Sequence, residues 1–274
     1  MLRDWTGDWI GTFIGHKGAV WCARLCHDTS VAVTASADFS AKIWDTMNGT
    51  CMHTLQHQHI VRSVAISPDG SHVLTGGNER LLRLYDLEDI DNVHLLVDSE
   101  DGKNEAHSST IKSILWQDAA HAISASEDGH IKWWDLSTKK SFTSFQLNEP
   151  LSYLEWSANH TLIVAIAGNT IFFFDAASPT NIVKQHTLPH KPSCASVHPL
   201  TRDRFVVGSA DDTWVRIYDF ESATEIDCFK GHHGSVHAVE YSPDGEYFAS
   251  GSEDGTIRLW QNTPGRAYGL WRST

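Results

Sequence analysis

An aromatic residue followed by an aspartate recurs along this chain at a nearly constant spacing. The copies are Trp44-Asp45, Tyr85-Asp86, Trp134-Asp135, Phe174-Asp175 and Tyr218-Asp219, with a last copy that reads Trp260-Gln261. Their second residues are separated by 41, 49, 40, 44 and 42 positions. A period of about 40–45 residues is that of a four-stranded β-propeller blade. The sequence therefore predicts an all-β propeller with six recognisable blades, whose repeats end near residues 45, 86, 135, 175, 219 and 261.

Polar residues keep the same register upstream of these pairs. An acidic residue lies six positions before the aromatic one in five copies, as Asp38, Glu79, Asp128, Asp212 and Asp254. Earlier still comes a histidine, as His16, His57, His107, His190 and His232. The fourth copy has Gly168 and Leu147 at these two places. Its segments LSYLEW, LIVAIA and TIFFFD still predict strands.

Hairpin turns and complete polar sets refine the fold. The tetrapeptide SPDG at 67–70 and 242–245 predicts a tight turn between the first two strands of a blade. The repeat resembles that of WD-repeat proteins, in which a His, a Ser, an Asp and a Trp form a hydrogen-bonded set. That resemblance implies three complete sets: His16, Ser36, Asp38 and Trp44; His107, Ser126, Asp128 and Trp134; and His232, Ser252, Asp254 and Trp260.

A Ser, a His and an Asp close together would also suit a hydrolase triad. We favour the structural interpretation, because the set occurs three times at one period and no GxSxG nucleophile turn is present. The five cysteines form no CxxC pair, and the histidine groups at 57–59 and 232–237 have no further ligand at a convincing spacing. There is also no phosphate-binding loop. The sequence predicts no catalytic residue, no metal, no cofactor and no small-molecule substrate.

Charge and hydropathy narrow the class of partner. The chain has 34 Asp and Glu against 21 Lys and Arg, a formal net charge of -13. This balance argues against direct nucleic-acid binding, which usually shows a basic stripe. No segment approaches the roughly 18 apolar residues of a membrane span, and the first residues do not read as a signal peptide. We expect a soluble intracellular protein without membrane contact, whose partners are proteins.

Six residues are candidates for partner binding. In WD propellers, the residues beside the first apolar residue of each inner strand face one surface, and here they include Trp21, Arg62, Lys112 and His237. Trp and Arg are typical interface anchors, and Trp21 and Arg62 fall on adjacent blades. The alternative is that Trp21 packs under a loop. Trp9 and Trp271 fall on outer strands, whose edges can accept a partner strand.

Longer strings point to a narrower resemblance. The segments GDWIGTFIGHKGAVW, ASADFSAKIWD, LTGGNERLLRLYDL and GSEDGTIRLWQ and the tail YGLW at 268–271 resemble the serine/threonine kinase receptor-associated protein family, also called Unr-interacting proteins. The resemblance runs along the whole chain and is weakest from about 92 to 149. A second, less similar family is subunit i of translation initiation factor three, which shares a similar GHxGAVW segment.

The first resemblance implies a specific cellular role. It implies a non-catalytic, cytoplasmic and nuclear scaffold in the SMN complex, which assembles spliceosomal snRNPs for RNA splicing and mRNA processing. The implied partners are Gemin and SMN subunits and an Unr-like RNA-binding protein, with further adaptor roles in signalling. The alternatives are a scaffold like the initiation-factor subunit and an RNA-associated adaptor with a secondary RNA contact.

The start of the chain departs from the resembled family. That family is seven-bladed, and three strands of its first blade precede the GDWIGTF segment, whereas here only Met1–Asp8 precede Trp9. We expect one propeller domain over 1–274, with the outer strand of an incomplete first blade near 7–13 and a last outer strand near 267–272. We also expect Met1 to correspond to an internal methionine. An open seven-blade geometry, with marginal stability or aggregation in isolation, is the consequence that we predict.

Overall fold

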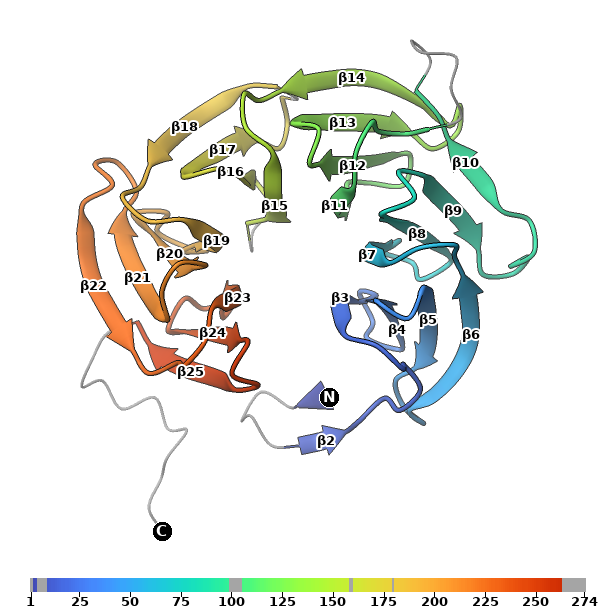
Figure 1. Ribbon diagram of the computed structural model, residues 1–274, viewed down its shortest axis with the longest axis horizontal. Coiled ribbons are helices and arrows are strands. Elements are labelled where there is room, and N and C mark those ends of the chain that lie inside the picture. Colours follow the sequence, from blue (N-terminus) through green and yellow to red (C-terminus); the bar gives the residue numbers. More distant parts are fainter. Residues whose placement is uncertain (1, 4–8, 99–104, 158–159, 179, 263–274) are drawn as a thin grey trace. The chain divides into compact units, whose positions relative to one another are not determined.

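A computed structural model describes residues 2–3, 9–98, 105–157, 160–178 and 180–262 of the chain. The chain divides into two compact units, 1–151 and 152–274, and each is described here by itself. Every regular element among the described residues is a β-strand (Figure 1). The predicted all-β WD-repeat propeller is confirmed. The described part of the chain has no helix that is long and apolar enough to cross a membrane.

The part of the first unit that the structure describes forms three four-stranded antiparallel sheets and one short pair of strands. The pair consists of β1 (Leu2–Arg3) and β2 (Trp9–Gly11). The first sheet consists of β3 (Val20–Leu25), β4 (Val31–Ser36), β5 (Ser40–Asp45) and β6 (Thr50–Gln56). The second consists of β7 (Val61–Ile66), β8 (His72–Gly77), β9 (Leu82–Asp86) and β10 (His94–Leu96). The third consists of β11 (Ile111–Trp116), β12 (His121–Ser126), β13 (His130–Asp135) and β14 (Lys140–Gln146).

The described residues of the second unit form two four-stranded sheets and one sheet of three strands. The first consists of β15 (Leu151–Trp156, which begins one residue before the boundary), β16 (Leu162–Ala167), β17 (Thr170–Asp175) and β18 (Ile182–Thr187). The second consists of β19 (Pro192–Val197), β20 (Arg204–Ser209), β21 (Trp214–Asp219) and β22 (Glu225–Lys230). The third consists of β23 (Val236–Tyr241), β24 (Tyr247–Ser252) and β25 (Ile257–Gln261).

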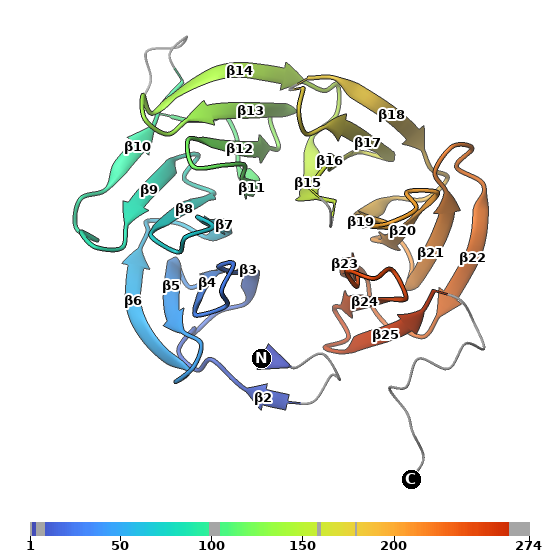
Figure 2. The ribbon, with the colours of Figure 1, turned by 180° about the vertical axis from the view of Figure 1, so that it is seen from behind.

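The third strand of each larger sheet ends with the aromatic-Asp pair, or with Trp260-Gln261 in the last sheet. These strands end at Asp45, Asp86, Asp135, Asp175, Asp219 and Gln261, where the period places the ends of the repeats. The degraded fourth copy still forms four strands, because its apolar residues bury both faces of β16. Within the first unit, β3, β7 and β11 lie at the same edge of their sheets when seen from either side (Figures 1 and 2).

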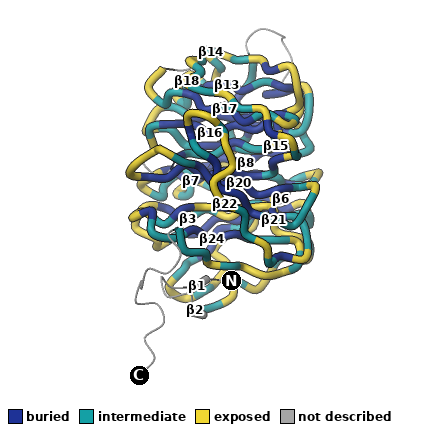
Figure 3. Tube along the Cα trace, turned by 90° about the vertical axis from the view of Figure 1, so that its left-hand side faces the viewer, coloured by how far each residue is buried: buried dark blue, intermediate teal, exposed yellow. Residues whose placement is uncertain are grey.

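Adjacent sheets of a unit pack through a repeated set of apolar positions. Val61, Val64 and Ile66 of β7 form one buried cluster with residues of β4 and β5, including Val33 and Ile43. Second strands such as β20 are largely buried, while fourth strands such as β22 are more exposed (Figure 3). Removal of this apolar area from water is the main stabilising contribution to such a fold.

Three sheets contain the expected polar network, but its hydroxyl differs from the prediction. In the β3–β6 sheet, His16 Nδ1 lies 2.9 Å from the Asp38 carboxylate, and Nε2 lies 2.7 Å from Thr34 Oγ1. Thr34 Oγ1 also accepts the indole N–H of Trp44 at 2.8 Å. Ser36, which we predicted in this place, instead accepts the backbone N–H of Asp38 at 3.2 Å.

The same correction applies to the other two sets. Ser124 is hydrogen-bonded to both His107 and Trp134. Ser250 is hydrogen-bonded to both His232 and Trp260. The predicted Ser126 and Ser252 instead accept the backbone N–H groups of Asp128 and Asp254, respectively.

The strand register explains why the Trp44 indole bonds to Thr34 and not to Ser36. Trp44 pairs with Ala32, so Thr34 lies about 7 Å along the strand and Ser36 about 13 Å. An indole reaches the nearer hydroxyl only.

Where the aromatic residue is tyrosine, an arginine takes part instead. In the β7–β10 sheet, Arg83 contacts both Glu79 and His57. In the β19–β22 sheet, Arg216 donates to the Asp212 carboxylate at 2.7 Å. Each acidic residue of the repeat thus keeps a cationic or imidazole partner, as a half-buried carboxylate requires.

Candidate interaction surface

Trp21 and Arg62 form a stacked pair on the first unit. Trp21 is the second residue of β3, and Arg62 is the second residue of the neighbouring strand β7. The guanidinium carbon of Arg62 lies 4.0 Å from the centroid of the Trp21 ring, a cation–π geometry. Trp21 is 51% exposed, so it does not pack under a loop. An exposed indole that is held by a guanidinium is preorganised for contact with another molecule.

The same surface continues along the unit through three more polar residues. Arg62 Nε donates to Asn78 Oδ1 at 3.4 Å, and this contact fixes the guanidinium on a second side. Lys112 of β11 forms an ion pair of 2.7 Å with Glu127. The hydrogen bond from Lys112 is the main cause that lowers the pKa of Glu127, and the charge of Arg62 lowers it further. Trp21, Arg62, Asn78, Lys112 and Glu127 are called the Trp21 surface below.

The other predicted partner-binding residues belong to the second unit or have side chains outside the described residues. His237 belongs to the second unit, where its Nε2 lies 3.9 Å from Glu253 and its side chain is largely exposed. The backbone of Trp9 lies in β2, but its side chain is outside the described residues. Trp271 and the predicted strand near 267–272 lie outside them as well.

A second stacked cluster, which the sequence did not single out, lies on the second unit. The ammonium of Lys230 lies 3.9 Å from the ring centroid of Trp214, and the guanidinium of Arg216 lies 4.9 Å from it. Trp214 and Lys230 are cross-strand partners, so a Trp and a Lys at facing positions of β21 and β22 were the available signal.

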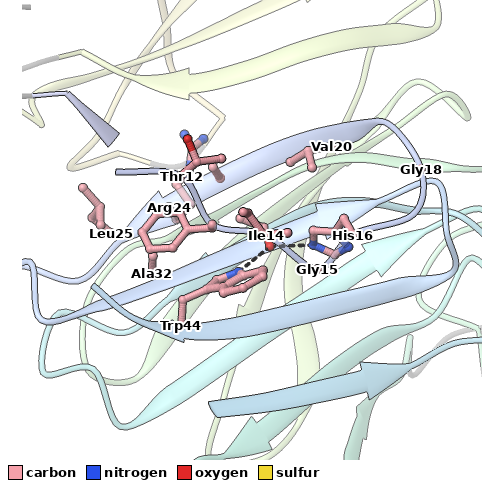
Figure 4. Close-up of a pocket in the computed structure, with 13 residues that line it drawn as sticks. Thr12, Ile14, Gly15, His16, Gly18, Val20, Arg24, Leu25, Ala32 and Trp44 are labelled. Atoms are coloured by element: carbon pink, nitrogen blue, oxygen red, sulfur yellow. Dashed lines mark hydrogen bonds between the residues drawn. The ribbon is translucent and has the colours of Figure 1, made fainter. Parts of the chain in front are cut away.

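An apolar hollow of about 680 Å³ lies beside β3 and β4. Its lining includes Phe13, Ile14, Val20 and Leu25, and Trp44 lies at its base beside His16 (Figure 4). The dashed contacts in the figure belong to the Thr34 network. The lining is mostly apolar and holds no set of facing acids, bases and nucleophiles.

The buried networks are poorly suited to catalysis. Burial raises the pKa of the Asp128 carboxyl, but hydrogen bonds from His107 and from backbone N–H groups outweigh burial and hold that pKa well below its usual range. Burial lowers the pKa of His107. At neutral pH a neutral imidazole therefore bridges an ionised Asp128 and the Ser124 hydroxyl, which is fully buried and also accepts the indole N–H.

The Cys194 thiol and the possible metal ligands bear on two further kinds of chemistry. Burial raises the pKa of the Cys194 thiol to about 12, which disfavours a thiolate nucleophile. Among the residues that the structure describes, no three His, Cys, Asp or Glu side chains are placed to hold a metal ion together.

Sequence comparison identifies the family to which the chain belongs. The model of the WD domain, G-beta repeat, matches residues 7–45, 49–86, 100–135 and 223–261. The chain is 42% identical over 273 residues to the serine-threonine kinase receptor-associated protein of Bos taurus, which covers 99% of this chain and 75% of the relative. The chain belongs to the serine-threonine kinase receptor-associated protein family.

Other members of the serine-threonine kinase receptor-associated protein family give the same result. The human member is 41% identical over 99% of this chain and 75% of its own length. The Dictyostelium discoideum member is 42% identical over 95% of this chain and 86% of its own length. Subunit I of eukaryotic translation initiation factor 3 from Pyricularia oryzae is 27% identical over 93% of this chain and 81% of its own length. The resemblance inferred from GDWIGTF and YGLW is thus confirmed, and the initiation-factor subunits are more distant relatives.

Proposed function

We propose that this chain is a protein-interaction scaffold of the SMN complex that takes part in the assembly of spliceosomal snRNPs, in the cytoplasm and the nucleus. Gemin and SMN subunits and an Unr-like RNA-binding protein are the proposed partners. Family membership supports this role, and the names of the relatives add receptor-associated signalling as a further adaptor role.

The Trp21 surface is the observation that carries the scaffold role. It presents a half-exposed indole and a stacked guanidinium, the two side-chain types that dominate interface hot spots. Two sides of the guanidinium are already held by Trp21 and Asn78. A partner that binds here therefore loses little side-chain freedom on this side of the interface.

Affinity purification of the tagged endogenous chain, followed by mass spectrometry, tests the proposal. The wild type is compared with Trp21→Ala, Arg62→Ala and the control Phe142→Ala, a similarly exposed aromatic residue on β14. We expect Gemin, SMN and Sm proteins with the wild type and the control, and their loss with the first two variants. Recovery of these proteins with all variants would contradict the assignment to the Trp21 surface.

The second candidate function is a scaffold like subunit I of initiation factor 3. Its support is the 27% identity over most of the chain. Recovery of initiation-factor subunits without SMN or Sm proteins would favour it over snRNP assembly. An RNA-associated adaptor role predicts RNA affinity that falls steeply with salt, and a flat salt dependence would exclude it.

A further inference from the structure

The residue that follows the acidic residue of the repeat has a left-handed backbone in four copies. Its φ is +66 at Phe39, +64 at Arg80, +83 at Gly129 and +77 at Gly255. Glycine adopts this conformation without cost, whereas a bulky residue is strained in it by its Cβ. The fold uses the conformation, because the Phe39 carbonyl accepts the backbone N–H of His57 at 2.9 Å. Glycine would serve equally well there, so the fold requires this turn and not the phenyl ring.

The Phe39 side chain makes few contacts that would offset the strain. The other strained side chain, Arg80, forms an ion pair of 3.2 Å with Glu105. Phe39 is 43% exposed, and its ring meets that of His59 edge-on, with 6.0 Å between the centroids. His59 is itself exposed. Strained residues that the fold does not need are concentrated at binding sites, and an exposed phenyl ring is suited to contact with another molecule.

Backbone hydrogen bonds place Phe39 at the same end of the first unit as the Trp21 surface. The turn that carries Phe39 is bonded to the residues before β3, because the N–H of Ala37 donates to the Ala19 carbonyl at 2.8 Å. The loop before β7 is bonded in the same way to Asn78, whose N–H donates to the Ile60 carbonyl at 3.0 Å. Phe39 therefore adds a second exposed aromatic ring to this end of the unit.

The positive charge of Arg62 favours an acidic partner. The acidic residues in the turns between the second and third strands of the unit are already bonded within it, as Asp38, Glu79, Glu127 and Asp128. Arg62 Nε donates to Asn78, whereas no described residue accepts a hydrogen bond from its two terminal nitrogens or forms an ion pair with it. The fork of donors on a guanidinium matches the two oxygens of a carboxylate.

We propose that this end of the first unit binds a segment of a partner protein in which an acidic residue stands beside an apolar one. The carboxylate pairs with Arg62, and the apolar side chain packs on the exposed rings of Trp21 and Phe39. This inference rests on the scaffold role proposed above and adds the chemistry of the segment that the scaffold holds. A single carboxylate suits a chain of net charge -13 better than the many phosphates of RNA.

Selection of short random peptides on the purified full chain tests the proposal without a known partner. We expect the enriched peptides to share an Asp or Glu near an aromatic or aliphatic residue. The most enriched peptide is then synthesised, together with a form in which Asn and Gln replace its acidic residues. Fluorescence anisotropy should show that the amide form binds about tenfold more weakly or worse. Enrichment of basic or uncharged peptides, or no enrichment at all, would overturn the proposal.

Variants of the chain locate the site of the acidic peptide. Arg62→Met and Phe39→Gly should each weaken its binding about tenfold. Two controls should keep the wild-type affinity: Lys140→Met, which removes a positive charge at the start of β14, and Phe142→Ala, which removes an exposed ring with a similar edge-on contact to His121. Wild-type affinity in Arg62→Met or in Phe39→Gly would contradict the proposed contacts.

Stability separates a binding role of Phe39 from a structural one. The urea midpoint of Phe39→Gly should equal or exceed that of the wild type, because glycine relieves the strain at positive φ. A lower midpoint together with unchanged peptide affinity would make Phe39 a structural residue and overturn its place in the site.

The result is also separable from that of the snRNP proposal. Acidic peptides that require Arg62, combined with an affinity purification that lacks SMN and Sm proteins, would support this inference and contradict the snRNP role. Recovery of SMN and Sm proteins by a chain that selects no acidic peptide would do the reverse.

Discussion

The central carbon of the Arg62 guanidinium lies over the Trp21 ring, 4.0 Å from its centroid, and the two residues come from neighbouring sheets. The contact therefore joins the first strands of two blades at the surface. It leaves half of the indole open. An aromatic anchor that is already oriented by its own protein needs little further ordering on binding.

Truncation of Trp21 should weaken partner binding strongly. We expect Trp21→Ala to reduce affinity for a purified partner protein that copurifies with the wild type about 30-fold, which corresponds to about 2 kcal/mol. Arg62→Lys should also weaken binding, because an ammonium does not reproduce the planar stacking and the fork of donors. Calorimetric titration of both variants and of Phe142→Ala measures this. Equal affinities in all three proteins would move the binding site away from the Trp21 surface.

Substitution of Ser124 should destabilise the fold more than substitution of Ser126. Ser124 Oγ accepts the Trp134 indole N–H at 2.8 Å and lies 2.6 Å from His107 Nε2. Ser124→Ala leaves two buried polar groups without partners, and we expect it to lower the free energy of unfolding by about 2–3 kcal/mol.

Ser126→Ala is the matched control for that substitution. Ser126 Oγ accepts one backbone N–H at 3.2 Å, so its loss should lower the free energy of unfolding by about 1 kcal/mol. Urea unfolding of both variants gives the comparison. A larger loss of stability in Ser126→Ala than in Ser124→Ala would favour the predicted arrangement, in which Ser126 bonds to His107 and Trp134.

The sequence predicted the strands better than the side-chain network. The period of the aromatic-Asp pair places the third strand of every sheet, because that pair closes the strand wherever it occurs. The sequence alone does not show whether Thr34 or Ser36 accepts the Trp44 indole N–H, since both hydroxyls lie on one face of β4. Only the distance from the Trp44 indole decides between them.

Contacts between sheets were the least predictable part of the candidate surface. Trp21 and Arg62 were selected because they flank inner strands, but their stacking depends on the packing of β3 beside β7. The arginines that contact the acidic residue in the two repeats with a Tyr-Asp pair could have been predicted from their spacing in the sequence. Arg83 and Arg216 each lie four residues after an acidic residue and two before a tyrosine. The stacked cluster on Trp214 also contains Arg216.

Acid should destabilise the protein through buried neutral histidines. Burial, and then the neighbouring Arg83 guanidinium, lowers the pKa of His57 to about 4. Below pH 6.5 the unfolded chain binds a proton here that the folded chain does not, so this contribution is complete above that pH and is lost as pH falls toward 4. Between pH 7 and pH 5 we expect a loss of about 2 kcal/mol from this residue.

A glutamine at position 57 tests that assignment. His57→Gln removes the titrating group, so its free energy of unfolding should fall less between pH 7 and pH 5 than that of the wild type. Met47→Gln, at an exposed side chain that does not titrate, should keep the wild-type dependence. Urea unfolding at the two pH values measures both. An unchanged pH dependence in His57→Gln would show that other groups dominate.

Two glycines with positive φ in the second unit allow the cost of backbone strain to be measured apart from the cost of steric overlap. Gly245 has φ +70 and Gly255 has φ +77, but a Cβ at Gly255 meets open space while one at Gly245 would overlap the ring of His198. That ring cannot easily give way, because it packs 5.2 Å from the Tyr241 ring and its Nδ1 lies 3.0 Å from the Thr201 hydroxyl.

Alanine at the two positions should therefore have unequal effects. Gly255→Ala should lower the free energy of unfolding by about 1 kcal/mol, which is the strain of a Cβ at positive φ. Gly245→Ala adds an overlap inside a packed region, and we expect a further loss of about 1–3 kcal/mol. Thermal and urea unfolding of the two variants measures the difference. Equal destabilisation would mean that His198 swings out of the way, which a loss of the ring contact with Tyr241 would reveal by NMR.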